Sequence, residues 1–270
     1  MKKAASSIKT QLTAITLLLV AVPLILIILI TTLSTVSEGE ENVVEINDAQ
    51  ASIVEESVAD ILDQNMSALQ TLAASPSTIM YLSGGGDVEL GEDIKDQLIA
   101  IDDAMGDGNN TVITGPDGMQ VLRSNGELTD TSDREYFQKA MSGTLYVSDI
   151  QISKTTGKRI STFAAPVYDE NHENVIGIVT RNYDLSDFHN LIANEVTEDR
   201  QEIVIVDRNG DVVAHSSHEI DPENPESQAS NPFYTDSRGD KTSGDYVSVW
   251  AGDTWMISWI KEPKTGWVIA

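Results

Sequence analysis

The sequence predicts an α+β protein that consists of a transmembrane helix, a long helix and two tandem antiparallel-sheet modules. Three observations support this prediction. An uncharged apolar segment lies near the N-terminus, apolar residues recur at helical spacing through residues 34–75, and after Gly106 they alternate with a period of two. Steps of three and four residues are typical of a helix, and strict alternation is typical of a strand.

The apolar segment, residues 12–33, is long enough to cross a bilayer. It contains 22 residues and no charge, and at about 1.5 Å per residue a helix of this length spans roughly 33 Å. Pro23 lies in its middle, which is tolerated in lipid-embedded helices. The alternative is a signal peptide that is cleaved near Ser34 and releases a secreted binding protein, but its apolar core would be only about 7–15 residues long.

Charge predicts the orientation of this segment. Lys2, Lys3 and Lys9 precede it with no acidic residue, and several glutamates follow it. Basic residues are enriched on the cytoplasmic side of a membrane span. We therefore expect a protein of the cell membrane, with residues 1–11 in the cytoplasm and residues 34–270 outside the cell.

Residues 34–105 are expected to be helical. Residues 34–75 contain no proline, and their apolar side chains form one stripe that is suited to packing against the rest of the domain or a partner helix. The residue before a proline avoids the helical region, so Ser75-Pro76 ends the helix. Two shorter helices are predicted at residues 77–82 and 92–105.

Strands and turns follow Gly106. Residues 111–114 and 119–123 flank the sequence Gly-Pro-Asp-Gly, which predicts a hairpin. Ser132-Asp133 predicts the start of a short helix at residues 134–141. The remaining strands are expected at residues 145–152, 158–166, 175–183, 202–206, 211–216, 246–250, 254–259 and 267–270, with a helix at residues 185–193.

One internal repeat is visible. Residues 112–124 align without gaps on residues 204–216, with Val, Ile, Gly, Val and Ser in common at an offset of 92. Each copy opens a run of predicted strands. The simplest interpretation is a pair of similar modules in tandem, and the alternative is two unrelated hairpins that share a turn.

Composition limits the functions that this chain can have. Three of its 17 Lys and Arg precede residue 34, so 14 remain against all 43 Asp and Glu, a net charge of −29 for residues 34–270. Such a surface repels nucleic acid and anionic lipids. The absence of cysteine excludes disulfides, thiolate metal sites and thiol nucleophiles. His215 and His218 lie three residues apart but form only a weak metal-binding pattern. No catalytic constellation or cofactor-binding loop is recognisable in the sequence. We therefore expect a non-enzymatic protein without a cofactor.

Three local patterns resemble those of a known family. Together with the order of anchor, long helix and two modules, they resemble the double Cache (dCache) sensor region of methyl-accepting chemotaxis proteins from bacteria and archaea. The patterns are Ser132–Ala140 with Tyr146–Asp149, then Ala165–Asp169 with Val175–Val179, and finally Gly266–Val268.

The resemblance implies two PAS-like modules along the long helix. The first module, residues 106–196, would be membrane-distal and hold the ligand, and the second module, residues 197–270, would be membrane-proximal. The resemblance also implies a homodimer through the long helix. In such receptors a second transmembrane helix and a cytoplasmic signalling region contact cytoplasmic partners. Because neither follows within the 270 residues, we expect a fragment whose second module is truncated.

The predicted ligand contacts lie in the first module. Arg134 offers a planar fork for a carboxylate. Tyr136 and Phe137 offer aromatic walls, although one of two adjacent helical residues is expected to be core. Tyr146 offers a hydroxyl, and Asp149 could hold an amine or a sugar hydroxyl. The alternatives are local roles, with Arg134 paired to a neighbouring aspartate and Asp149 capping a turn.

The last strand of the first module carries a departure from the family pattern. The resemblance places an amine-binding aspartate of amino-acid receptors at Asn182, and Asp184 follows on the same face of the strand. An amide carries no charge, so an amino acid, a carboxylate, a purine and another polar metabolite are all open as ligands. A chemotaxis receptor is the leading hypothesis, and the sensor of a histidine kinase or diguanylate cyclase is the alternative.

Overall fold

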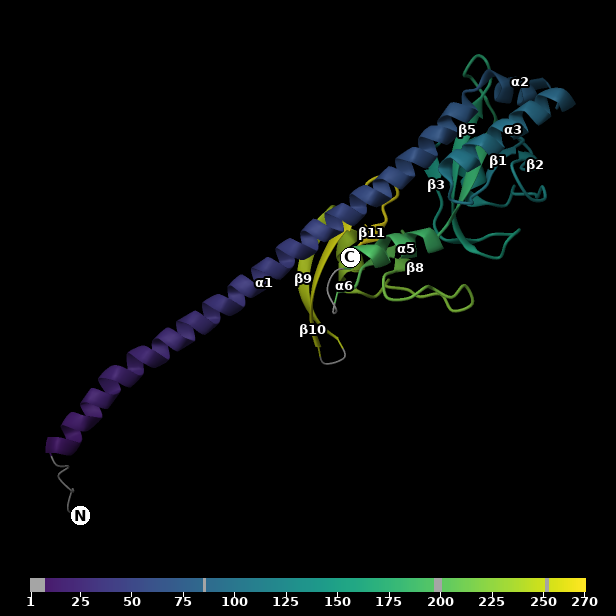
Figure 1. Cartoon of the computed structure of the whole chain (residues 1–270). Coiled ribbons are helices and arrows are strands. Elements are labelled where there is room, and N and C mark those ends of the chain that lie inside the picture. The colour runs from purple at the N-terminus through teal and green to yellow at the C-terminus, as the bar shows by residue number, and fades with distance from the viewer. Residues whose placement is uncertain (1–7, 85, 197–200, 251–252) are drawn as a thin grey trace. The chain divides into compact units, whose positions relative to one another are not determined.

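The computed structural model describes residues 8–84, 86–196, 201–250 and 253–270; Lys2 and Lys3 lie outside these ranges. The chain forms two compact units, residues 1–47 and residues 48–270. A single helix, α1 (Ile8–Ala73), contributes to both units. The predicted transmembrane helix and long helix are therefore one continuous helix, coloured purple to blue in Figure 1.

The first unit contains the apolar segment. Among the described residues, α1 is the one helix that is long and apolar enough to cross a membrane, and none of its most apolar stretch is buried. Leu17 and Ile25, for example, are 67% and 62% exposed. Exposed apolar side chains along a whole helix are suited to a lipid environment.

The first module of the second unit contains one antiparallel sheet. Its strands run in the order β2-β1-β6-β5-β3, and β4 also pairs with β5. The helices of this module are α2 (Pro76–Gly84), α3 (Val88–Met105), α4 (Glu135–Met141) and α5 (Ser186–Glu195). The strands are β1 (Thr111–Thr114), β2 (Gln120–Arg123), β3 (Tyr146–Val147), β4 (Gln151–Ile152), β5 (Arg159–Tyr168) and β6 (Val175–Asp184).

The second module repeats this topology, which confirms the predicted α+β fold with two sheets. Its strands run in the order β8-β7-β11-β10-β9, so the first hairpin lies beside the last strand in both modules. The elements are β7 (Val204–Val206), β8 (Val212–His215), α6 (Pro232–Ser237), β9 (Ser243–Trp250), β10 (Asp253–Lys261) and β11 (Val268–Ile269).

The sequence repeat corresponds to the two opening hairpins. In both, the strand register shifts at the same place, between Ile113 and Thr114 and between Ile205 and Val206. Gly118 and Gly210 occupy matching turn positions with φ of 85°. A Cβ at Gly118 would lie 2.4 Å from a side-chain atom of the following loop, so both the positive φ and the close approach require glycine.

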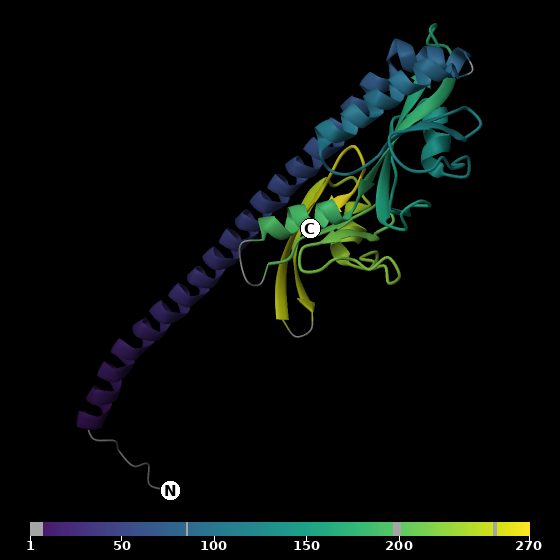
Figure 2. The same cartoon turned by 45° about the vertical axis from the view of Figure 1, so that its right-hand side comes forward.

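Alternation along the strands gives the sheet of the first module two different faces. Phe163, Ala165 and Val167 of β5 belong to the main core with α1 and α3, whereas Ala164 packs with α4. Figures 1 and 2 show α1, α2 and α3 together on one side of this sheet. The main core also includes residues of the second module such as Trp267, so α1 packs against both sheets within this unit.

Arg181 on β6 connects the helical layer to the sheet. Its side chain is fully buried, and its Nε atom donates to Asn65 Oδ1 of α1 at 2.9 Å. Its two terminal nitrogens form ion pairs with Asp102 of α3 and with Asp107 of the following loop. Because these partners come from separate elements, one guanidinium fixes the positions of α1, α3 and β6.

Several predicted boundaries were wrong. The expected strand at residues 145–152 is divided into β3 and β4, because Ser148 bonds to β5 with its side chain: its Oγ accepts the Thr162 amide at 2.9 Å. The helix expected at residues 134–141 begins at Glu135, and Asp133 pairs with Lys154 at 2.8 Å instead of capping it. Helix α6 was not predicted; Asn231 caps it ahead of a proline.

Replacing the buried guanidinium should destabilise the fold. We expect Arg181→Met to lower the free energy of unfolding by about 3–5 kcal/mol, because it leaves Asp102 and Asp107 without their cation. Urea denaturation followed by circular dichroism measures this, with exposed Lys241→Met as the control. A loss below about 1 kcal/mol would contradict a central role for Arg181.

Acid should weaken the same cluster. Burial alone would raise the pKa of Asp107, but hydrogen bonds from Asn109 and Arg181 outweigh it and lower the pKa below the ordinary value of 3.8. A lowered folded-state pKa stabilises the protein above the unfolded pKa, and this stability is lost as pH falls through the folded value. Urea midpoints measured between pH 7 and about pH 3 should therefore fall less steeply in Asp107→Asn than in wild type. Equal slopes would contradict this, and exposed Asp103→Asn serves as the control.

Candidate functional site

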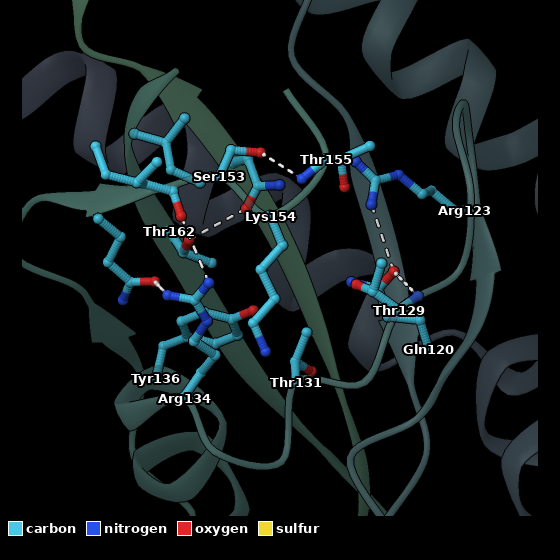
Figure 3. Close-up of a pocket in the computed structure, with 14 residues that line it drawn as sticks. Gln120, Arg123, Thr129, Thr131, Arg134, Tyr136, Ser153, Lys154, Thr155 and Thr162 are labelled. Carbon is cyan, nitrogen blue, oxygen red and sulfur yellow. Dashed lines mark hydrogen bonds between the residues drawn. The ribbon is translucent and has the colours of Figure 1, made fainter. Parts of the chain in front are cut away.

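A cavity opens on the α4 side of the first module's sheet. It holds about 310 Å³ of space free of protein atoms, part of which is open to solvent. Figure 3 shows its lining side chains. They come from β2, the loop that follows it, the start of α4, β4 and its turn, β5 and β6: Gln120, Arg123, Thr129, Thr131, Arg134, Tyr136, Gln151, Ile152, Ser153, Lys154, Thr155, Ile160, Thr162 and Asn182.

Three of the predicted ligand residues line this cavity. Arg134 stands at the N-cap position of α4 and donates to Gln151 Oε1 and to the Ile152 carbonyl, both at 3.4 Å. Burial raises the pKa of Tyr136 above 10.0, so its hydroxyl stays protonated at neutral pH. Asn182 lies on β6, next to Thr162 of β5.

The remaining four predicted residues do not line the cavity. Phe137 is 7% exposed and belongs to the small core under α4. Tyr146 and Asp149 contact Arg208 of the second module. Asp184 lies on the same side of β6 as Asn182 but further along the strand, where it pairs with Lys158 at 2.6 Å. Of the adjacent residues Tyr136 and Phe137, and of Asn182 and Asp184 on one side of β6, only the first of each pair lines the cavity.

Arg208 explains why Tyr146 and Asp149 lie elsewhere. Its Nε donates to Asp149 Oδ1 at 2.9 Å, and one of its terminal nitrogens donates to the Tyr146 hydroxyl at 3.0 Å and to the Val147 carbonyl at 2.8 Å. The guanidinium carbon also lies 4.9 Å from the centre of the Tyr146 ring. The turn of the second module's repeated hairpin thus docks on the first module beside β3.

Sequence reasoning missed the most buried cation of the cavity. Arg123 ends β2 and is 5% exposed; its Nε donates to the Asn125 carbonyl at 2.6 Å. Burial lowers its pKa, although a guanidinium stays protonated in proteins. Its position at the end of a predicted strand gave no signal, and in the repeat it aligns with His215.

The second module carries a larger side chain at a position equivalent to Ala164, which packs under α4 beside this site. The cross-strand pairs align the two sheets. In the first module the row across β1, β6 and β5 is Ile113, Val179 and Ala165. In the second module the row across β7, β11 and β10 is Ile205, Ile269 and Ile260. Trp259 therefore stands where the first module has Ala164. Its indole is 2% exposed and packs under α6 with other core residues.

A second cavity lies where the two modules meet. It encloses about 730 Å³ and includes Asp184 and Lys158 of the first module, together with Val213 of β8. Arg159 also lines it, but its guanidinium donates to the carbonyls of Val212 and Val213. His215 and His218 lie nearby on β8 and its loop, and no group of three or more metal-ligating side chains occurs in the described part of the chain.

The two sheets of one topology, the long helix and the polar cavity of the first module are the features of a two-module ligand-binding sensor domain. Residues 32–270 match the family described as a Cache domain, of the dCache_1 type. The chain therefore belongs to the double Cache family. No protein with curated function matches its sequence.

The solved structures that share this fold include three sensor domains. The ligand-binding domain of Campylobacter jejuni chemoreceptor Tlp3 with 4-methylisoleucine has a TM-score of 0.66 and 15% identity, covering 85% of this chain and 90% of that one. The V. cholerae histidine kinase DctB sensor domain has a TM-score of 0.62 and 15% identity, covering 85% of this chain and 96% of that one. The ligand binding domain of the Pseudomonas aeruginosa PAO1 amino acid chemoreceptor PctB with L-Arg has a TM-score of 0.59 and 17% identity, covering 86% of this chain and 94% of that one. Identities this low show a common fold only.

The junction between the modules should contribute to stability. We expect Arg208→Ala to lower the free energy of unfolding by about 1–3 kcal/mol, because it removes charged hydrogen bonds. A double-mutant cycle with Asp149→Ala, measured by urea denaturation, should show that the two losses are not additive. Additive losses would mean that the two side chains are not coupled, and the exposed Lys241→Ala is the control.

Proposed function

We propose that residues 34–270 form the extracytoplasmic sensor of a chemoreceptor that binds a small polar molecule and signals across the membrane to control chemotaxis. The observation that carries this proposal is the polar cavity at Arg134, Tyr136 and Asn182, on a module that belongs to the Cache family. Chemoreceptor domains of the same fold, whose ligands are named as 4-methylisoleucine and L-Arg, support it.

The apolar part of α1 is the proposed anchor. Its length and composition suit a membrane span, and Lys2, Lys3 and Lys9 at its start favour a cytoplasmic N-terminus. Because α1 continues without interruption to Ala73, a change in its position within the sensor unit would be carried toward the membrane. This coupling requires the ligand to bind two conformations with different affinities.

We also propose that two copies pair through α1. Ile46 and Ile53 are 54% and 49% exposed on this helix, and an exposed apolar stripe of this kind suits a second helix. Signals would pass to cytoplasmic partners. A ligand would then act on the dimer by shifting one helix against the other.

A second candidate output is a sensor histidine kinase or diguanylate cyclase. The DctB sensor domain has this fold at a TM-score of 0.62 and belongs to a histidine kinase. The two outputs separate in a swimming assay. Deletion of the encoding gene abolishes directed swimming toward the ligand if the output is chemotaxis, whereas for a kinase or cyclase it leaves swimming unchanged and alters phosphorylation or cyclic-dinucleotide levels.

Binding in the first-module cavity is tested directly on the whole chain in detergent. A metabolite library is screened by thermal shift, since a ligand that binds the folded state raises its stability. For any hit, we expect Arg134→Ala to weaken affinity at least about tenfold, the loss typical of one charged hydrogen bond. Lys139→Ala, on the exposed face of the same helix, is the matched control. Unchanged affinity in Arg134→Ala would refute the assignment of this cavity.

A further inference from the structure

The charged side chains that line the first-module cavity have the sign opposite to that of the chain's net charge. The sequence contains 43 acidic and 17 basic residues, excluding histidine. The side chains that line the cavity nevertheless include Arg123, Arg134 and Lys154 and no Asp or Glu among the residues that the structure describes. A cationic site within an acidic protein concentrates anions locally.

Arg123 is a buried cation without an anionic partner. Its guanidinium donates to neutral acceptors, namely the carbonyls of Asn125 at 2.6 Å and Glu127 at 3.5 Å and the Gln120 side chain at 3.4 Å. No carboxylate forms an ion pair with it across the described ranges. Asp102, which lies within electrostatic range, is already paired with Arg181. An uncompensated buried charge is costly, and a bound anion would remove that cost.

Arg134 is a second guanidinium without a carboxylate partner in the described part of the chain. Its two hydrogen bonds, to Gln151 and to the Ile152 carbonyl, are long at 3.4 Å and have neutral acceptors. Lys154 differs, since its Nζ forms an ion pair with Asp133 at 2.8 Å. Two guanidiniums therefore remain for anionic groups of a ligand.

The two guanidiniums lie apart. Figure 3 shows Arg123 on one side of the cavity with Gln120 and Thr129, and Arg134 on the other side with Tyr136, with Lys154 between them. Each guanidinium presents a planar fork that matches one carboxylate. This arrangement favours two separate anionic groups on one small molecule over a single compact anion.

Asn182 places a neutral amide in the cavity and no negative charge that could pair with a ligand's ammonium group. Its Oδ1 accepts a hydrogen bond from Thr162 Oγ1 at 3.1 Å, which leaves its amide N–H groups as donors to the cavity. A donor at this position suits an anion and offers no counter-charge to an ammonium group. The cavity thus contains no described acidic side chain to pair with the amine of an amino acid.

We propose that the first module binds a small dicarboxylate, with Arg123 and Arg134 each holding one carboxylate and Asn182 donating a further hydrogen bond. This inference rests on the proposed function, since it names the ligand class of the same cavity.

Calorimetry on the whole chain in detergent tests the ligand class. Malonate, succinate and glutarate provide two carboxylates at different separations. Butyrate lacks one of the two carboxylates, succinamide lacks both negative charges, and inorganic phosphate is a single compact anion. L-isoleucine and L-arginine carry an ammonium group. We expect at least one dicarboxylate to bind about tenfold or more tightly than every other probe, and more weakly as salt concentration rises.

Variants test the three contacts separately. Arg134→Ala and Arg123→Gln should each weaken dicarboxylate binding about tenfold to a hundredfold, and Lys139→Ala should not. Arg123→Gln could also disturb the loop at residues 125–127, because Arg123 donates hydrogen bonds to it. Asn182→Asp is a separate test, because aspartate has nearly the same shape as asparagine and differs in its charge. Its carboxylate should repel the dicarboxylate, weakening binding at least about tenfold, while the affinity for L-isoleucine or L-arginine increases.

The outcomes distinguish the inference from the proposed function. If an amino acid or phosphate binds more tightly than every dicarboxylate and Arg134→Ala weakens that binding, the dicarboxylate inference is overturned while the sensor function stands. If Asn182→Asp leaves dicarboxylate affinity unchanged, the assigned contacts are wrong. If no dicarboxylate binds and no library hit depends on Arg134, both proposals fail.

Discussion

The buried guanidinium of Arg181 is the constraint on which the sensor module depends. It reaches across the interface between helices and sheet to bond with Asn65, Asp102 and Asp107. Buried charges are tolerated only when they are paired and hydrogen-bonded, so the three partner segments must keep one arrangement. The same strand then presents Asn182, the next residue, to the opposite face. One strand thus anchors the long helix on one side and contributes to the cavity on the other.

The chain contains two modules with one topology and different interiors. Both opening hairpins share a register shift and a glycine with φ of 85°, but Trp259 stands where the first module has Ala164. Ala164 packs in the small core under α4, whereas the indole of Trp259 packs in a separate core under α6. The second module packs on α1 through the main core, which includes Trp267. It docks on the first module through Arg208, which bonds to β3 and to Asp149.

Charge is distributed in two ways in this protein. The acidic residues are mostly on the surface, whereas Arg181, Arg159 and Arg123 are buried. Arg181 has carboxylate partners, and Arg159 bonds to backbone carbonyls of the second module. Arg123 has only neutral acceptors and lines the cavity, which is why its charge is assigned to a ligand and not to the fold.

The sequence by itself determined the apolar segment, the long helix, the two sheets and the repeat, because these depend on local periodicity and on turn residues such as Gly118 and Gly210. It also predicted Arg134, Tyr136 and Asn182 among seven ligand contacts, and in the structure these three line one cavity. Only the tertiary structure separated these from Tyr146, Asp149 and Asp184, since Arg208 and Lys158 approach from distant parts of the chain. Arg123 was likewise invisible in the sequence, because burial and the lack of a carboxylate partner are properties of the folded surroundings and not of the residue.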